Sequence, residues 1–229
     1  MNYFEIEKNL QVALDDGQKI EIISFRVDEA VEKQLLLTVE KILERYSRAH
    51  LKDALFSCAL ELATNATKAN MKHVYFTERG LDIDKPEDYE KGMAGFKDVV
   101  LTRPWLEAYA EKARSLGLHV QMIFTHTDDG LRIEIINNRP ILAQDEERIR
   151  EKFQKAMTYD SLHEYFLDHA DQTEGEGLGF ALNILLLKGE NLDATLFRIG
   201  REERGTIARI EVPFTDKFVS VRPKEKPDA

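Results

Sequence analysis

The sequence predicts one α+β domain: a two-layer α/β sandwich with helices on one face of a mixed sheet, or of an antiparallel one. Its 229 residues are 43% hydrophobic and 32% charged, which supports a single globular domain with a sizeable core. Asp-Asp-Gly triplets at 15–17 and 128–130 each separate two β-prone runs, a pattern typical of hairpins. Predicted helices and strands are mixed without strict alternation, which favours an α+β sandwich.

The first third of the chain predicts a hairpin followed by two helices. The runs on either side of 15–17 are expected to pair as an N-terminal hairpin. Asp28 can cap the next helix, in which apolar residues recur at helical period over 31–43. A second helix is expected over about 51–70, and a strand over 72–77.

The middle of the chain predicts an insertion. Residues at about 78–117 begin with a polar stretch that glycine and proline interrupt, followed by a helix between Pro104 and Gly117. We expect the domain to span 1–214 and to include this insertion. A tail at 215–229, partly disordered, follows the domain.

The second half of the chain predicts strands on both sides of a mostly helical stretch. Two alternating strands are expected around 128–130, and two more around the turn at 201–204. Between these hairpins, 143–177 is strongly charged and is expected to mix helix with mobile loop. An apolar helix over 178–188 should be buried on most sides.

The charge balance disfavours nucleic acid as a partner. The chain has 32 basic and 42 acidic residues, a net charge of -10, whereas binding to a phosphate backbone depends on excess Lys and Arg. The N-terminus lacks the basic flank and apolar run of a signal peptide, and the apolar run at 178–187 is too short to span a bilayer. Cys58, the one cysteine, cannot form an internal disulfide. We therefore expect a cytoplasmic protein without a membrane partner.

The helix expected at 51–70 carries an acid, an amide and a base on one narrow stripe. At 100° per residue, Asn65 lies at about 40° and Lys68 at about -20° from Glu61. The apolar face of the helix borders this stripe, which is where the wall of a cleft would lie. A solvated helix edge is the alternative interpretation, because an isolated pattern of this kind is weak evidence.

Three glycines, Gly175, Gly177 and Gly179, lie at the start of the apolar helix. Glycine allows close approach of the backbone to a ligand, and a helix N-terminus offers unpaired N–H groups at the positive end of its dipole. Together these features suit an anion such as phosphate. The spacing matches neither a P-loop nor a Rossmann fingerprint, and a flexible hinge before a core helix is the alternative.

The order of these motifs resembles the histidine-kinase-like (Bergerat-fold) ATPase superfamily. "ELATNATKA" is similar to its N box, "GEGLGF" to its second glycine box, and "GTIARIEVP" to its terminal Gly-Thr strand. The layout is most similar to anti-sigma-factor serine kinases and to histidine kinase catalytic domains, over roughly 20–214 apart from the insertion. The resemblance implies a sandwich of this ATPase type.

The resemblance also implies ATP and Mg²⁺ as cofactors. Asn65 would bind, through its amide oxygen, the Mg²⁺ that bridges the phosphates. Glu61 would orient or deprotonate the attacking nucleophile, and Lys68 would neutralise charge on the phosphate side. The triphosphate would be lined by the segment with Gly175, Gly177, Leu178 and Gly179. Thr206 would lie near the adenine.

The strand that matches the family's first glycine box departs from its Asp-x-Gly-x-Gly pattern. Asn137 stands at the aspartate position, and Arg139 and Ile141 stand at the glycines. An asparagine oxygen can still accept a hydrogen bond from the adenine amino group. The lost glycines, however, place side chains where the pattern allows a close approach.

The leading interpretation is a Mg²⁺-ATP-binding kinase or ATPase module that acts as a stand-alone cytoplasmic regulator. Its partners would be ATP and a regulatory protein, and a homodimer is compatible with the sequence. The alternative is a degenerate module of the same fold, without nucleotide binding, that serves as a protein-interaction scaffold. A third hypothesis, an unrelated α+β enzyme, predicts that Glu61 and Gly177 lie far apart.

Overall fold

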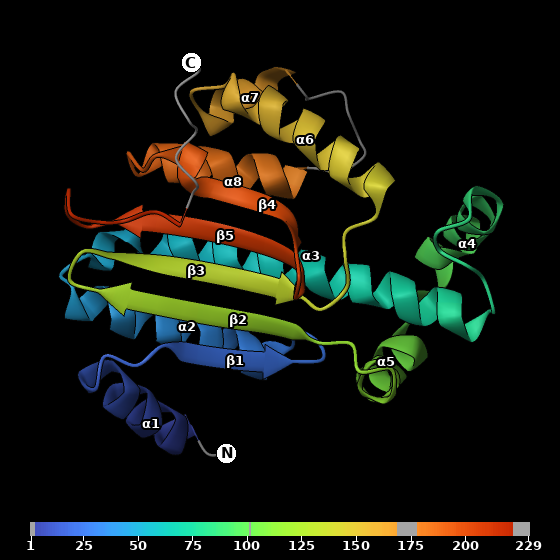
Figure 1. The fold of residues 1–229 in the computed structure, drawn as a ribbon, viewed down its shortest axis with the longest axis horizontal. Helices are drawn as coiled ribbons and strands as arrows, with labels where there is room; N and C mark the ends of the chain where they lie inside the picture. Colours follow the sequence, from blue (N-terminus) through green and yellow to red (C-terminus); the bar gives the residue numbers. More distant parts are fainter. Residues whose placement is uncertain (1–2, 101, 169–177, 222–229) are drawn as a thin grey trace.

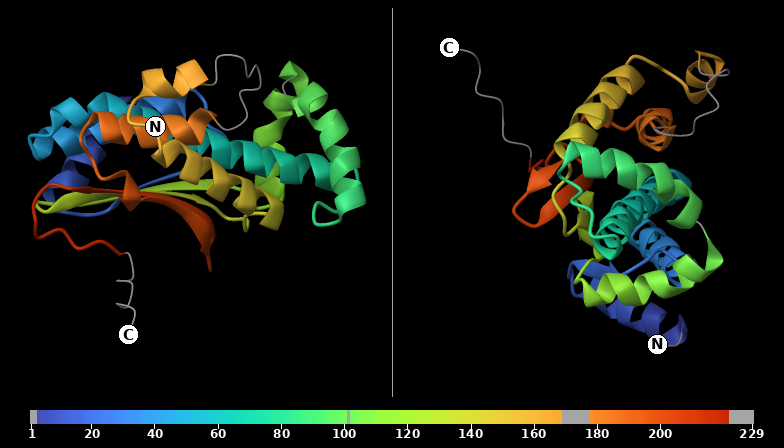
Figure 2. Two further views of the ribbon diagram at one scale, coloured as in Figure 1. Left: turned by 90° about the horizontal axis from the view of Figure 1, so that it is seen from above. Right: turned by 90° about the vertical axis from the view of Figure 1, so that its right-hand side faces the viewer.

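A five-stranded sheet with helices packed on one face forms the body of the molecule over the described residues (Figure 1, Figure 2). The computed structural model describes residues 3–100, 102–168 and 178–221. In chain order, its elements are α1 (Tyr3–Asp15), β1 (Ile20–Ser24), α2 (Glu29–Arg45), η1 (Ala49–Leu51), α3 (Lys52–Glu78), α4 (Pro86–Val100), α5 (Arg103–Ser115), β2 (Val120–Thr127), β3 (Gly130–Asn137), α6 (Ala143–Met157), α7 (Leu162–Asp168), α8 (Leu178–Gly189), η2 (Ala194–Leu196), β4 (Phe197–Glu202) and β5 (Gly205–Pro213).

The described strands are ordered β1-β2-β3-β5-β4, and each neighbouring pair is antiparallel. Short turns join β2 to β3 and β4 to β5, and turns of two residues connect antiparallel strands. Ile133 of β3 is paired with Phe124 of β2 and Ile210 of β5, so apolar side chains form rows across one face. The predicted α+β class is confirmed. The prediction of a mixed sheet is wrong, because all neighbouring pairs of described strands are antiparallel.

The main core lies between the sheet and the helices α2, α3 and α8 (Figure 2). Leu35 and Val39 of α2, Leu55 of α3, Phe124 of β2 and Ile184 of α8 are all fully buried. The helices meet the sheet along apolar stripes with a period of about 3.6 residues, and the strands contribute alternate residues. This layer holds α3 against the sheet and thereby positions the polar stripe.

The N-terminal hairpin prediction is wrong, because α1 occupies the place of its first strand. Leu10 and Leu14, one helical turn apart, are 6% and 1% exposed, whereas Val12 between them is 53% exposed. In a strand all three side chains would lie on one face. The helix is selected by packing, since α1 contacts both α2 and β1.

The strand predicted at 72–77 is also wrong, because α3 continues as one helix to Glu78. Val74, Tyr75 and Phe76 favour strands by intrinsic propensity, yet all three lie in the helix and are buried. Their side chains belong to a second apolar cluster with α4 and α5. Packing on several sides of the helix overrides the propensity of its residues.

The segment predicted as an insertion forms α4 and α5, which pack around the far end of α3 (Figure 1). The predicted helix after Pro104 is confirmed as α5, and Trp105 and Tyr109 stack at 5.3 Å between ring centroids. The stretch that looked polar and interrupted is the helix α4. Its glycines lie within the helix, where they allow close packing on α3.

The remaining predicted elements are confirmed over the described residues. Asp28 caps α2, since its Oδ1 accepts hydrogen bonds from the backbone N–H groups of Ala30 and Val31, both at 3.1 Å. Both later hairpins are present. The charged stretch contains α6 and α7, while 169–177 and the end of the predicted tail, 222–229, lie outside the described residues.

Helix α8 is apolar on most sides, as predicted. Ile184 is fully buried, and Leu185 and Leu187 are nearly so. The helix packs against α3, α6 and α7 rather than standing apart. Among the residues that the structure describes, no helix has both the length and the apolar composition that crossing a membrane requires.

The helical period of α1 can be tested with two matched substitutions. Leu14→Ala should lower the free energy of unfolding by about 2–5 kcal/mol, because a buried leucine is truncated. Val12→Ala should change it by no more than about 0.5 kcal/mol, because that side chain faces water. Urea denaturation of the two variants measures both values. Equal losses would instead indicate a strand with Val12 and Leu14 on one buried face.

Candidate functional site

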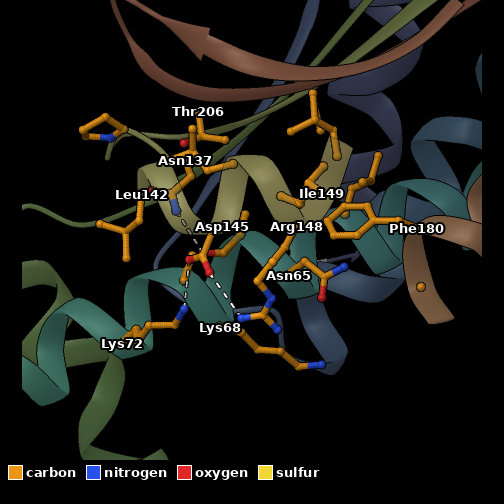
Figure 3. A pocket seen from close by; sticks show the side chains of 18 of the residues that line it. Asn65, Lys68, Lys72, Asn137, Leu142, Asp145, Arg148, Ile149, Phe180 and Thr206 are labelled. Carbon is orange, nitrogen blue, oxygen red and sulfur yellow. Dashed lines mark hydrogen bonds and ion pairs between the residues drawn. The ribbon is translucent and has the colours of Figure 1, made fainter. Parts of the chain in front are cut away.

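A cavity of about 380 Å³ opens between α3, α6, α8 and the ends of β3 and β5 (Figure 3). Helix α4 contributes to its wall at the far end of α3. Of the residues that the sequence analysis assigned to a site, Glu61, Asn65, Lys68, Asn137, Gly179 and Thr206 line this cavity, and Leu178 is the first residue of α8. The fold therefore brings together residues that are up to 145 positions apart in the sequence.

The polar stripe of α3 forms one wall of the cavity. Asn65 Nδ2 donates a hydrogen bond to Glu61 Oε1 at 2.9 Å. Because this bond engages the amide nitrogen, Asn65 Oδ1 remains as an acceptor, and no described residue donates to it. Lys68 lies on the same wall and is exposed (Figure 3). Glu61 and Asn65 are only partly exposed, so the solvated-edge interpretation does not describe them.

Gly179 lies directly against the carboxylate of Glu61. A Cβ atom at Gly179 would lie 1.8 Å from Glu61 Oε1, a distance that no side chain could tolerate without displacing the carboxylate. Gly179 is the second residue of α8, which begins at Leu178, so the start of this helix meets the polar stripe. Gly175 and Gly177, the other members of the predicted phosphate cradle, lie outside the described residues.

Asn137 is held by hydrogen bonds within the protein. Its Nδ2 donates to the carbonyl of Ala66 on α3 at 3.3 Å, and its Oδ1 accepts from the backbone N–H of Arg139 at 3.1 Å. The residue is 5% exposed. The asparagine therefore ties the end of β3 to α3, and both polar atoms of its side chain have partners.

Thr206 secures the same turn from the neighbouring strand. Its backbone N–H and its hydroxyl both donate to the carbonyl of Arg139, at 3.0 and 2.7 Å. Ile141 is buried and lines the cavity, whereas Arg139 is absent from the described lining. The cavity is therefore present with Arg139 and Ile141 at the two positions where the resemblance led us to expect glycines.

A second cationic residue of α3, Lys72, connects the polar stripe to α6. Its Nζ lies 3.0 Å from Asp145 Oδ2, and Arg148 Nη1 lies 3.8 Å from Asp145 Oδ1 (Figure 3). Lys72 was missed because the predicted helix ended at about 70, and Asp145 and Arg148 were missed because they lie in the charged stretch 143–177, to which no site was assigned. At 100° per residue Lys72 lies about 20° from Glu61, on the same stripe.

The far end of the cavity has an apolar and aromatic lining that the sequence analysis also missed. It is formed by His73 of α3, Ile83, and the α4 residues Tyr89, Met93 and Phe96. Their spacing on α4 contained a usable signal, since residues at four and three positions apart share one face of a helix. The polar appearance of this stretch concealed that pattern.

The cavity is more cationic than the chain as a whole. Its described wall carries Lys68, Lys72, Arg148 and Lys152 against the acids Glu61 and Asp145, in a chain with a net charge of -10. Burial, with the charges of Arg139 and Lys72, lowers the pKa of His73 to about 4, so its imidazole is neutral near pH 7. An anionic ligand suits this combination.

Cys58 lies outside the cavity lining and is buried in the core. Burial raises the pKa of the Cys58 thiol to about 12, which makes it an inert core residue.

The described residues contain no cluster of three or more His, Cys, Asp or Glu side chains suited to a metal ion. A Mg²⁺ ion that is held largely by phosphates and water needs only one or two protein ligands.

Comparison with known proteins finds one informative similarity. The chain is 33% identical over 206 residues to an uncharacterized protein of Treponema pallidum (strain Nichols). The matched region covers 90% of this chain and 40% of the relative, so the chain spans less than half of the relative's length. No protein-family model matches the chain, and no solved structure matches it.

The contact between Gly179 and Glu61 predicts that substitutions at these two positions have coupled effects on the free energy of unfolding. Gly179→Ala should be less favourable in the wild type than in a Glu61→Ala background by about 1 kcal/mol, because the new methyl group displaces the Glu61 carboxylate from its hydrogen bond with Asn65. In the Glu61→Ala background the same change should be neutral or slightly stabilising, since the overlapping atoms are gone and alanine favours a helix over glycine. A double-mutant cycle by urea denaturation measures the difference. The same cost in both backgrounds would contradict the contact.

Proposed function

We propose that this chain is a Mg²⁺-ATP-binding module of the histidine-kinase-like ATPase type, with kinase or ATPase activity in a regulatory role. The observation that carries the proposal is the pairing of Asn65 with Glu61 on α3, directly opposite Gly179 at the start of α8. That arrangement places an amide oxygen, a carboxylate and a helix N-terminus around one space. These are the groups that a metal-bound phosphate chain requires.

The residues present fit Mg²⁺ and triphosphate. The hydrogen bond from Asn65 Nδ2 to Glu61 fixes which atom of the amide is the free acceptor, and an oxygen ligand suits a hard cation. Lys68, and Arg148 and Lys152 of α6, supply positive charge around the same space. Asn65 would hold the Mg²⁺, which when bound would neutralise part of the phosphate charge.

Glu61 is the residue best placed to act on a nucleophile. Its carboxylate accepts from Asn65 through Oε1 and lies against the backbone of Gly179. A carboxylate held beside the phosphate end can orient a water molecule or a protein hydroxyl and accept its proton. The acceptor could be a serine of a regulatory protein or water, and the same residue would serve both reactions.

One observation favours a second candidate function. Both polar atoms of the Asn137 side chain have partners in the protein, Ala66 and Arg139, so the amide is engaged in structure where the family would contact adenine. A module of this fold that has lost nucleotide binding and serves as a protein-interaction scaffold would show the same feature. Direct binding measurements separate the two functions.

Mg²⁺-ATP should raise the melting temperature of the wild-type protein. At a hundredfold excess over the dissociation constant, binding adds about 2.7 kcal/mol, or roughly 5–10 °C for a chain of this size. Asn65→Ala should abolish the shift because the metal ligand is lost. Thr77→Ala, an exposed position on the same helix, should retain it. Thermal melts with and without Mg²⁺-ATP provide the measurement.

Binding measurements on the wild-type protein decide between an ATP-binding module and an interaction scaffold. Absence of a shift at millimolar ATP, together with no heat on titration with a non-hydrolysable ATP analogue, would reject nucleotide binding and favour the scaffold. A shift that survives Asn65→Ala would leave nucleotide binding in place but remove the metal ligand assigned to Asn65.

The role of Glu61 predicts a separation of binding from turnover. Glu61→Gln keeps the acceptor for Asn65 but loses the base, so it should retain the melting shift while phosphate release falls by about 10²–10⁴-fold. A coupled phosphate-release assay beside the thermal melts measures both. Turnover equal to that of the wild type would show that another group activates the nucleophile.

A further inference from the structure

The cavity extends well beyond the groups that a phosphate chain and its metal would use. From Asn65 to His73 the lining of α3 continues for eight residues, or about 12 Å along the helix axis at 1.5 Å per residue. At the far end the wall changes from charged groups to the aromatic and thioether side chains of α4. A metal ion or a free phosphate would occupy only the charged end of this elongated space.

Helix α4 is held in a defined position against α3. A Cβ atom at Gly92 would lie 2.3 Å from the Phe76 ring, and one at Gly95 would lie 2.7 Å from the Tyr75 hydroxyl. These two glycines, three residues apart, share one face of α4 and seat it at close range on α3. Close packing against α3 therefore fixes the position of the wall that α4 presents to the cavity.

The cavity-facing side of α4 has the chemistry of a platform for a flat ring. Tyr89, Met93 and Phe96 follow one another at four and three residues and all line the cavity. Both aromatic rings pack against rings of α3: the Tyr89 and Phe76 ring centroids are 5.9 Å apart, and Phe96 meets Tyr75 edge to face at 5.5 Å. Lys72 Nζ lies 5.7 Å from the centroid of the Tyr89 ring, at the boundary between the charged and the aromatic part of the wall. Aromatic and thioether groups bind planar bases by stacking and soft contact.

His73 adds a polar group to this apolar end. Its imidazole lines the cavity, and no described residue forms a hydrogen bond with either ring nitrogen. A neutral imidazole offers one donor and one acceptor. It could therefore pair with an amino group or a ring nitrogen of a base without adding charge.

The opposite wall, near β3, is less suited to a base. The amide of Asn137 is engaged at both atoms, and the hydroxyl of Thr206 already donates to the carbonyl of Arg139. Each of these groups thus already holds one partner in the protein, and Asn137 Oδ1 and the Thr206 hydroxyl keep acceptor capacity only. The ring nitrogens of His73 at the α4 end have no described partner.

We infer that α4 and His73 form a subsite for the aromatic base of the nucleotide, at the opposite end of the cavity from Glu61 and Asn65. This inference rests on the proposed function for the anionic part of the ligand. The base would lie among Tyr89, Met93 and Phe96, with its polar edge toward His73, while its phosphates extend along α3 past Lys72. The segment that looked like an insertion thereby contributes the specificity of the site.

Calorimetric titration with two probes, Mg²⁺-ATP and Mg²⁺-tripolyphosphate, tests this assignment. Wild type should bind Mg²⁺-ATP at least about tenfold tighter than Mg²⁺-tripolyphosphate, because only ATP carries a base to stack. Met93→Ala and His73→Ala should each weaken ATP binding about fivefold or more. Both should leave tripolyphosphate binding unchanged, which also shows that the variants are folded.

Two control variants sharpen the comparison. Met71→Ala truncates a methionine that packs in the same apolar cluster but does not line the cavity, so it should leave both affinities unchanged. Thr206→Val probes the wall near β3 and should alter ATP binding less than Met93→Ala does.

The outcomes separate the inference from the proposed function. If both probes bind wild type equally, or if Thr206→Val lowers ATP affinity while Met93→Ala and His73→Ala do not, the α4 subsite is wrong and the phosphate site stands. If neither probe binds wild type, the proposed function fails and the inference fails with it.

Discussion

The continuity of helix α3 is the constraint on which the rest of the structure depends. Its 27 residues extend about 40 Å at 1.5 Å per residue, so one rigid element crosses the sheet and continues beyond it. The first half packs Leu55 and Leu62 into the main core, and the last turns hold α4 and α5 through Tyr75 and Phe76. Because the helix does not break between these halves, the polar stripe and the aromatic wall share one cavity.

Hydrogen bonds of Asn137 and Thr206 hold that helix and the end of the sheet in one arrangement. The Asn137 amide connects the end of β3 to the Ala66 carbonyl, while Thr206 and Asn137 both bind the backbone of Arg139. A buried polar group such as the Asn137 amide, when it is satisfied in this way, specifies one arrangement of the elements that it joins. These bonds engage Asn137 and Thr206 in the protein, whereas Lys72 and His73 line the cavity farther along α3.

Local signals in the sequence were sufficient where one element decides its own conformation. The cap at Asp28, the two turns between paired strands and the apolar run of α8 were all predicted correctly, because capping, turn chemistry and periodicity act within a few residues. The predictions failed at Leu10–Leu14 and at Val74–Phe76. There the same residues suit a strand or a helix, and burial against α2 or against α4 and α5 selects the helix.

The sequence by itself determined that Glu61, Asn65 and Lys68 share a stripe beside an apolar face, because helix geometry sets that angle for any helix. Only the tertiary structure decided that Gly179 meets Glu61, that Asp145 and Arg148 lie across from Lys72, and that α4 closes the cavity with Tyr89 and Met93. These contacts join segments that are distant in the chain. Their positions follow from how several apolar faces pack together, and no local pattern of residues encodes that result.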